Sequence, residues 1–315
     1  MSLILARACA ILSTWSTGEV DPLDELRTLI IRHAAGQRGH SVHLIDGIQV
    51  SRRDEPTELT ASIAQPSVAI VASGVKLTML NGVAYEYGVG QFLVTSLDLP
   101  VVGQALKATP DDPFAVVSLR LDPVEIAPLL LDTLERPPQY AGLVVSDATP
   151  DLLDPVVRLL RIADRPDDVR VLGPGIRREI LWRLLTGEQG GLVRQIGLAD
   201  GMLAHISRAI SWIRRHHHEP LLVADLAELA GMSPSTFHRH FRAATSMTPI
   251  QFQKQIRLQE ARILLRTQSL TAAEVGFQVG YTSPAHFTRE YHKAFGRTPG
   301  EDRTNFLSPV VAEGS

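Results

Sequence analysis

The sequence predicts an α+β protein of two domains. A strand-rich N-terminal half with appended helices precedes an all-α C-terminal half that contains two helix-turn-helix units. Two observations support this division. Short runs of strand composition, separated by turns, occupy residues 41–50 and 68–122 and suggest a barrel or sandwich. A segment near the C-terminus then recurs at an offset of about 50 residues, as Phe237 and Phe287 illustrate.

Composition and charge are compatible with this organisation. The 315-residue chain is 44% hydrophobic and 21% charged, which is ordinary for a globular protein with two cores. Residues 1–205 hold 18 Lys and Arg against 25 Asp and Glu, a net charge of −7, whereas residues 206–315 hold 13 against 9, a net charge of +4. An acidic domain joined to a mildly basic one fits a sensor joined to a DNA-binding module.

The cysteine content and the apolar runs of the sequence indicate where in the cell the protein is expected. The single cysteine, Cys9, excludes an internal disulfide and a zinc site made of thiolates, which suits a reducing cytoplasm. The apolar N-terminal run has no preceding basic residue and is interrupted by Arg7, so we expect no secretion signal. No apolar run is long enough to span a bilayer. We therefore expect a cytoplasmic protein without a membrane segment.

The clearest strand pair in the N-terminal half surrounds Asn81-Gly82. Both residues accept positive φ, which is typical of a two-residue hairpin turn. We expect the alternating apolar positions around this turn to share one side of the sheet. These positions are Leu77, Met79, Val83, Tyr85 and Tyr87. Tyr85, Tyr87 and Phe92 are candidates for lining an effector pocket, although alternation alone predicts that they pack in the core.

Helical patterns follow the strands. Asp122-Pro123 predicts a capped helix that extends to about residue 134. Leucines and valines over 152–160 form a second helical stripe, which needs either a partner subunit or the barrel to cover it. Gly173-Pro174-Gly175 predicts a break before a third helix over 176–186. We expect a sensing or dimerisation domain over 1–187, a linker over 188–205, a DNA-binding domain over 206–306 and a tail over 307–315.

The first helix-turn-helix unit is expected at about 222–243. Ser233 and Pro234 would begin its second helix, since Ser caps and Pro favours the first turn. Phe237 and Phe241 are four residues apart, so both should point inward. At about 100° per residue, a polar set lies on the opposite face. This set comprises Ser235, Thr236, His238, Arg239 and Arg242.

The second unit, expected at about 270–293, repeats the arrangement. Phe287 and Tyr291 should point inward, and the outward set comprises Ala285, Thr288, Arg289 and His292. A helix that begins after Thr248-Pro249 would hold the two recognition helices about 34 Å apart, in successive major grooves. Arg239 and Arg289 would then contact base edges. Arg242 and His292 would contact phosphates, and the smaller polar residues and Ala285 would set base preference.

These residues resemble the AraC/XylS family of bacterial transcription regulators. The resemblance covers about residues 206–306, through the Ala-Gly-Met-Ser turn at 230–233, the pattern Arg-Leu-x-x-Ala-Arg-x-Leu-Leu at 257–265, and Phe-Gly-x-x-Pro at 295–299. Three positions depart from the family pattern. Leu222 stands where a helix cap is usual, Ser246 replaces a usual Gly, and Gly276 replaces a usual Ala at a cost of up to ~1 kcal/mol.

The N-terminal half resembles the N-terminal domain of one AraC subfamily, for example at residues 52–57, 88–94 and 173–187. The resemblance implies a cupin-like β-barrel followed by helices. It also implies a sequence-specific transcription regulator, with activation as one expected mode. The implied partners are double-stranded operator DNA, RNA polymerase, a second copy of the chain in a homodimer, and a small-molecule effector that the sequence does not identify.

Two alternative functions remain at this point: a cupin-type enzyme fused to a DNA-binding module, and a DNA-binding regulator that needs no ligand. We expect no catalytic residue, metal or cofactor. His40 and His43 are three apart and would face opposite sides of a strand, which disfavours a metal site. The histidines at 216–218 suit a solvated helix end, and Cys9 has no identified partner that would make it reactive.

Overall fold

The computed structural model describes residues 21–36, 41–133 and 139–307, and it confirms the α+β two-domain organisation. The N-terminal domain contains two antiparallel sheets, of strand order β1-β2-β9-β4-β7-β10 and β3-β8-β5-β6. Its strands are β1 Ser41–Ile45, β2 Ile48–Arg53, β3 Thr60–Ala64, β4 Ser67–Ser73, β5 Val75–Leu80, β6 Val83–Gly88, β7 Gln91–Thr95, β8 Leu99–Lys107, β9 Phe114–Arg120 and β10 Leu143–Asp147.

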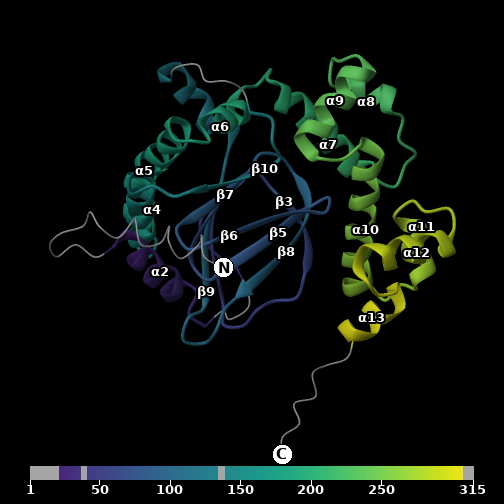
Figure 1. Ribbon diagram of the computed structural model, residues 1–315, viewed down its shortest axis with the longest axis horizontal. Helices are drawn as coiled ribbons and strands as arrows, with labels where there is room; N and C mark the ends of the chain where they lie inside the picture. The colour runs from purple at the N-terminus through teal and green to yellow at the C-terminus, as the bar shows by residue number, and fades with distance from the viewer. Residues whose placement is uncertain (1–20, 37–40, 134–138, 308–315) are drawn as a thin grey trace, which may run out of the picture.

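Helices flank the barrel on two sides (Figure 1). On one side lie α2 Pro22–His33, α4 Pro150–Ile162 and α5 Pro166–Thr186, and on the other lie the C-terminal helices. The remaining helices are α3 Pro123–Ile126, a 3₁₀ helix η1 Ala127–Asp132, α6 Gly190–Gly197, α7 Met202–Arg215, α8 Val223–Leu229, α9 Pro234–Thr245, α10 Pro249–Thr267, α11 Ala272–Gln278, α12 Pro284–Phe295 and α13 Pro299–Leu307.

The predicted hairpin is confirmed, but its predicted face is not. Asn81 and Gly82 have φ of 49° and 81°, so both positions use the left-handed region. The two-residue turn pairs Thr78 with Tyr85 and Lys76 with Tyr87. Directly opposed residues share a face, so Leu77 and Met79 lie on the side opposite to both tyrosines. Across the turn, even-numbered positions of β5 share a face with odd-numbered positions of β6. The sequence prediction placed odd-numbered positions of both strands on one face and therefore assigned the wrong partners.

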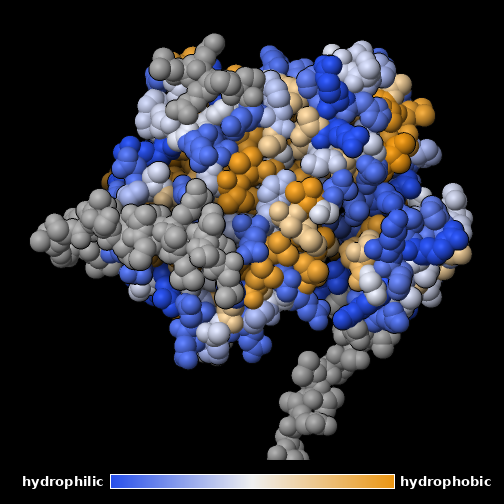
Figure 2. All heavy atoms as spheres, in the orientation of Figure 1, coloured by the Kyte–Doolittle hydropathy of each residue, from blue (hydrophilic) through white to orange (hydrophobic). Residues whose placement is uncertain are grey.

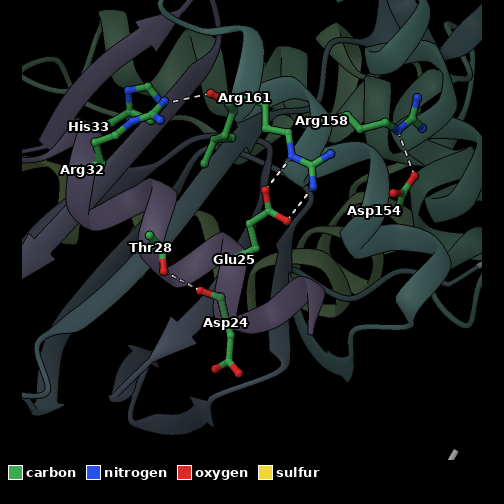
Figure 3. A network of polar contacts seen from close by, with 9 residues as sticks. Asp24, Glu25, Thr28, Arg32, His33, Asp154, Arg158 and Arg161 are labelled. Carbon is green, nitrogen blue, oxygen red and sulfur yellow. Dashed lines mark hydrogen bonds and ion pairs between the residues drawn. The ribbon is translucent and has the colours of Figure 1, made fainter. Parts of the chain in front are cut away.

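The helix α2 packs between the six-stranded sheet and α4. Arg161 of α4 donates two hydrogen bonds to the carboxylate of Glu25 on α2, of 2.5 and 2.6 Å, and the His33 ring lies 2.9 Å from the Leu160 carbonyl oxygen (Figure 3). The hydrogen bond to Arg161 lowers the pKa of Glu25. Arg161 is half exposed, so this bidentate pair contributes mainly to orientation and only modestly to stability.

Two helical predictions change, and a helix lies in the stretch expected as a linker. The helix capped by Asp122, whose carboxylate accepts from the Val124 N–H at 2.9 Å, gives way to 3₁₀ geometry after residue 126, because Pro128 lacks the N–H that α-helical bonding needs. The predicted break at 173–175 is wrong, since α5 continues through Pro174 and buries Leu181 and Leu184. Tertiary packing outweighs local propensity there. The stretch 188–205 contains α6, whose Leu192 and Val193 are fully buried.

One hydrophobic core runs from the barrel into the first helix-turn-helix unit. It includes Ile70 and Val117 of the barrel, Leu160 of α4, and Phe237 and Phe252 of the C-terminal half. A second, separate core belongs to the second unit and is formed by residues of α10, α11 and α12. The apolar stripe over 152–160 is covered within the chain itself, by the core that also includes α2 and α5. The first unit is therefore packed onto the barrel, and the second is not.

Polar side chains and one close backbone approach join the barrel to the first unit. The Asn81 side chain donates to the Ser246 carbonyl at 2.6 Å, and Arg214 forms an ion pair with Asp98. Gly142 packs so closely that an added Cβ would lie 2.5 Å from the Ala244 carbonyl oxygen. A side chain at position 142 would therefore force the barrel away from the end of α9.

We expect Gly142→Ala to destabilise the protein by about 1–3 kcal/mol through overpacking. The matched control is Gly175→Ala, because a Cβ there meets no atom within 4 Å and the helical position favours Ala by about 0.5–1 kcal/mol. Thermal unfolding of both variants measures the difference. Equal or higher stability of Gly142→Ala would contradict the close packing.

Candidate nucleic-acid interface

The first helix-turn-helix unit consists of α8 and α9. Gly231 lies between them with φ of 65°, a left-handed conformation that favours glycine. Ser233 caps α9 by accepting from the Thr236 N–H at 3.4 Å, and Pro234 takes the first turn. Leu222 precedes α8 without a side-chain cap, as the departure from the family pattern predicts. These local features fix where α9 begins and how it leaves the turn.

An aromatic pair holds one face of α9 against the core. Phe237 and Phe241 are both 0% exposed, with ring centroids 5.4 Å apart, and Phe241 meets Phe252 of α10 edge-on at 5.5 Å. Burying two phenylalanines on one face leaves the opposite face to solvent. Ser235, His238, Arg239 and Arg242 are exposed on α9. Thr236 is half-buried, and its hydroxyl accepts from Ser233 at 3.0 Å.

The second unit repeats this construction in α11 and α12. Thr271 and Glu274 form a capping box at the start of α11, and the Ser283 side chain accepts from the His286 N–H at 3.4 Å. Phe287 and Tyr291 are 0% exposed, with centroids 5.6 Å apart. Ala285, Arg289 and His292 are exposed, whereas Thr288 is half-buried and donates to the Pro284 carbonyl at 2.9 Å.

Gly276 shows why the second unit departs from the family pattern. An added Cβ at this position would lie 2.9 Å from the Phe287 ring. The ring thus occupies the space that an alanine methyl would need. The close packing of α11 against α12 therefore requires glycine at position 276, despite the lower helix propensity of glycine.

One buried residue that the sequence analysis did not single out completes the second unit. Asp302 of α13 is 1% exposed and accepts from the Tyr291 hydroxyl at 2.7 Å and from Arg262 of α10 at 3.2 Å. Burial and the carboxylate together raise the pKa of Tyr291. In the sequence, Asp302 is only an acidic residue shortly after the Phe-Gly-x-x-Pro pattern at 295–299, and that position does not specify a partner.

The recognition helices carry little negative charge. Glu290 is the one acidic residue in the sequences of α9 and α12, and it pairs with Lys254 of α10 at 2.6 Å. That hydrogen bond lowers the pKa of Glu290. The exposed cations Arg239, Arg242 and Arg289 therefore dominate the local field, as a surface that attracts phosphate requires. Figure 2 shows mainly hydrophilic side chains over α10 to α13.

The barrel candidates lie in its interior. Tyr87 and Phe92 are 1% and 5% exposed, and Tyr85 is half-buried. Burial raises the pKa of Tyr87 to about 12, with its hydroxyl 3.5 Å from that of Thr78. These contacts make Tyr87 and Phe92 part of the core, and Tyr85 remains the most accessible of the three.

The histidines singled out in the sequence are dispersed. His43 is exposed and contacts Gln49, while the ring of His33 lies within 3.4 Å of Asp164. His216 stacks on Trp212 with centroids 4.5 Å apart. His40 and Cys9 lie outside the described residues. Within the described ranges, no three His, Cys, Asp or Glu residues gather as a metal site would need, and no helix there is long and apolar enough to cross a bilayer.

Comparison with known proteins agrees with this geometry. A family model described as AraC-type transcriptional regulator N-terminus matches residues 44–192, and one described as a helix-turn-helix domain matches residues 226–305. Two repeated units that present cations opposite buried aromatic pairs, attached to a barrel of this type, agree with both descriptions. The chain belongs to the AraC/XylS family, as its sequence resemblance implies.

Curated relatives match parts of the chain. The HTH-type transcriptional regulator CdhR of Pseudomonas aeruginosa is 34% identical over 96 residues, 30% of this chain and 29% of CdhR. The HTH-type transcriptional activator RhaS of Salmonella schwarzengrund is 26% identical over 155 residues, 48% of this chain and 54% of RhaS. This chain therefore spans from about a third to about half the length of these relatives.

Solved structures share the fold over most of the chain. ToxT of Vibrio cholerae with an unsaturated fatty acid bound has a TM-score of 0.52 at 11% identity, covering 85% of this chain and 97% of ToxT. ToxT bound to a methylnaphthalenyl butenoic acid has a TM-score of 0.55 at 9% identity, covering 83% of this chain and all of ToxT. At this identity the likeness concerns the fold alone.

Proposed function

We propose that this regulator binds a specific operator by placing α9 and α12 in successive major grooves on one side of the duplex. The observation that carries the proposal is the matched pair of exposed arginines, Arg239 and Arg289. Each projects from the face opposite a fully buried aromatic pair. Because the burial fixes the rotation of each helix, both guanidinium groups face away from the protein in equivalent positions.

The polar side chains of the two helices, with Ala285, divide into four roles. Arg239 and Arg289 bind base edges, since an arginine fork matches the two acceptors of guanine. Ser235, His238 and Ala285 refine base preference beside them. Thr236 and Thr288 orient the helices, because their hydroxyls already bond to Ser233 and Pro284. Arg242 and His292 lie one turn further along each helix and contact phosphates.

We also propose that a small-molecule effector modulates this regulator, and that it binds in a cleft between the barrel and the DNA-binding domain. The cleft has a volume of about 440 Å³ and is lined by residues 61–63 of β3 together with α7 and α10. Its walls combine four arginines, Arg214, Arg215, Arg262 and Arg266, with the apolar Ile63, Ile256 and Ile263. Glu260 is the one acidic residue among the lining.

This lining favours an amphipathic carboxylate. Arg214 and Arg262 form ion pairs with Asp98 and Asp302, whereas Arg215 donates a hydrogen bond to the Ser211 carbonyl and has no acidic partner among the described residues. A carboxylate would satisfy the guanidinium of Arg215 while its apolar part covers the isoleucines. The cleft touches both domains, so occupancy would change how firmly α10 is held to the barrel. The unsaturated fatty acid bound to ToxT belongs to this class of ligand.

The remaining partners follow from the family. We propose a cytoplasmic homodimer that acts with RNA polymerase, in which α5 supplies the dimer contact. The stripe on α4 is covered within the chain, but Val171 and Leu172 of α5 are 65% and 49% exposed. Adjacent exposed apolar residues on one helix are the kind of surface that a second copy of the chain can cover.

We expect Arg239→Ala and Arg289→Ala each to weaken operator binding by ~1–3 kcal/mol and to relax base preference at separate positions, about one helical turn apart. Arg242→Ala is the matched control, because losing a phosphate contact weakens all sequences alike and lowers the salt slope by about one unit. Binding to a single-substitution operator series at two salt concentrations measures both. If Arg239→Ala and Arg289→Ala keep full base preference, or lose it at the same base pair, the placement of the two helices in successive grooves is wrong.

Oleate should raise the thermal unfolding midpoint of the wild-type protein, and oleyl alcohol, which lacks the carboxylate, should not. Arg215→Ala should reduce the oleate effect several-fold, since a charge-assisted hydrogen bond contributes about 1.5–3 kcal/mol. The matched control is Arg208→Ala, an exposed arginine on the same helix that does not line the cleft. Equal shifts for both variants would place the ligand elsewhere.

Leu172→Asp should shift the protein toward monomer, with a dissociation constant raised about tenfold or more for burial of a charge in an apolar contact. Leu229→Asp is the control, because Leu229 is 42% exposed on α8, in the C-terminal half of the chain. Sedimentation at micromolar concentration gives the oligomeric state. A wild-type protein that remains monomeric there would exclude the dimer.

A further inference from the structure

The two helix-turn-helix units have separate hydrophobic cores, and α10 connects them. Phe252 and Ile256 of α10 belong to the core shared with the barrel, whereas Leu258 and Leu265 belong to the core of the second unit. With no continuous apolar packing across this boundary, the angle between the units depends on α10 and on the polar contacts beside it. Those contacts converge on Arg257.

The Arg257 guanidinium bonds at once to the turn that leads into the first unit and to the turn inside the second unit. Its Nε donates to the His217 carbonyl at 2.5 Å and its Nη2 to the Glu219 carbonyl at 2.9 Å, both in the turn that follows α7. Its Nη1 donates to the Gly280 carbonyl at 3.0 Å, in the turn between α11 and α12. One planar group therefore spans from the end of α7, which packs against α8 and α9, to the turn of the second unit.

Neighbouring residues on α10 and in the turn of the second unit add to the contacts of Arg257. Gln253 donates a second set of bonds to the carbonyls of His217 and Glu219, at 3.1 and 2.8 Å. Gly280, with φ of 94°, lies so close that an added Cβ would be 2.4 Å from the His218 carbonyl oxygen. Arg257 also lies over the Tyr281 ring, 6.0 Å from its centroid. The two turns thus meet at a contact that only glycine allows.

Arg257 has no acidic partner among the described residues. Burial lowers its pKa, and the nearby Tyr281 opposes that shift. Guanidinium nevertheless stays protonated in proteins, so the charge must be balanced by dipoles. The carbonyls that follow α7 supply them, since the C-terminal end of a helix carries partial negative charge. The bridge therefore requires a delocalised cation with several donors fixed in one plane.

We propose that Arg257 is the positioning residue that sets the angle between the two recognition helices, and thereby the spacing of the two DNA boxes that the protein accepts. Its role in DNA spacing rests on the function proposed above, but its role in geometry does not. Without the guanidinium, α12 keeps its own core and remains folded, while its direction relative to α9 is no longer fixed. Lysine cannot replace it, because one ammonium does not present a planar fork.

The test measures the distance between the recognition helices directly. Cys9 is the one cysteine in the chain, so Cys9→Ser provides a background for spin labels at Ala243→Cys on α9 and Ala294→Cys on α12, both exposed positions. Double electron–electron resonance should give a narrow distribution of the distance between the two labels in the protein that keeps Arg257. In Arg257→Met the distribution should be broader by about twofold or more, as hinge motion between the two units predicts. Arg257→Lys, which keeps the charge, should broaden it as well. Arg208→Met, on the exposed surface of α7, is the control.

A second arm uses operator DNA with one base pair inserted between the two boxes. The protein with Arg257 should lose about tenfold or more in affinity for the lengthened operator, as losing one box's base contacts would imply. Arg257→Met should bind both operators within about twofold. Unchanged distance distributions in both Arg257 variants would overturn the proposal. A chain that prefers no DNA sequence would overturn the proposed function instead, while the distance measurement would still decide the role of Arg257.

Discussion

Burial of an aromatic pair on one face of each recognition helix is the constraint on which the DNA-binding half depends. Phe237 and Phe241 in α9, and Phe287 and Tyr291 in α12, are 0% exposed. Each pair fixes helix rotation because side chains four residues apart share a face. The face left to solvent is then determined, and with it the direction of Arg239 and Arg289. The caps at Ser233 and Ser283 fix where each helix begins, so axial position and rotation are both specified locally.

The two units are alike in sequence but not in their attachment. The first unit shares a core with the barrel, and the Asn81 side chain on the hairpin turn reaches the Ser246 carbonyl just after α9. The second unit has its own core and is completed by the buried Asp302, which links Tyr291 to Arg262. A change in the barrel can therefore reach α9 through direct packing. It can reach α12 only through α10 and the junction at Arg257.

The sequence predicted the parts of the fold that depend on local rules and missed those that depend on tertiary packing. Asn81-Gly82, Asp122 and Ser233 specified a turn and two caps because their effect extends over only three or four residues. Gly173-Pro174-Gly175 misled because burial of Leu181 and Leu184 outweighs the local cost. Arg239 and Arg289 could be placed on an exposed face by periodicity. Arg257 could not be assigned its role, because its three carbonyl partners lie 23 to 40 residues away in the chain.

One helix, α10, connects all the sites of the DNA-binding half because its faces are used differently. Ile256, Gln259 and Ile263 face the barrel cleft, and Gln259 donates to the Val101 carbonyl at 3.4 Å. Gln253 and Arg257, four residues apart, face the turn after α7. Leu258, Ala261 and Leu265 enter the core of the second unit. A ligand that draws α10 toward β3 would displace the Arg257 junction along with it, since a helix moves as a rigid element. Effector binding and the spacing of the recognition helices would then be two consequences of one displacement.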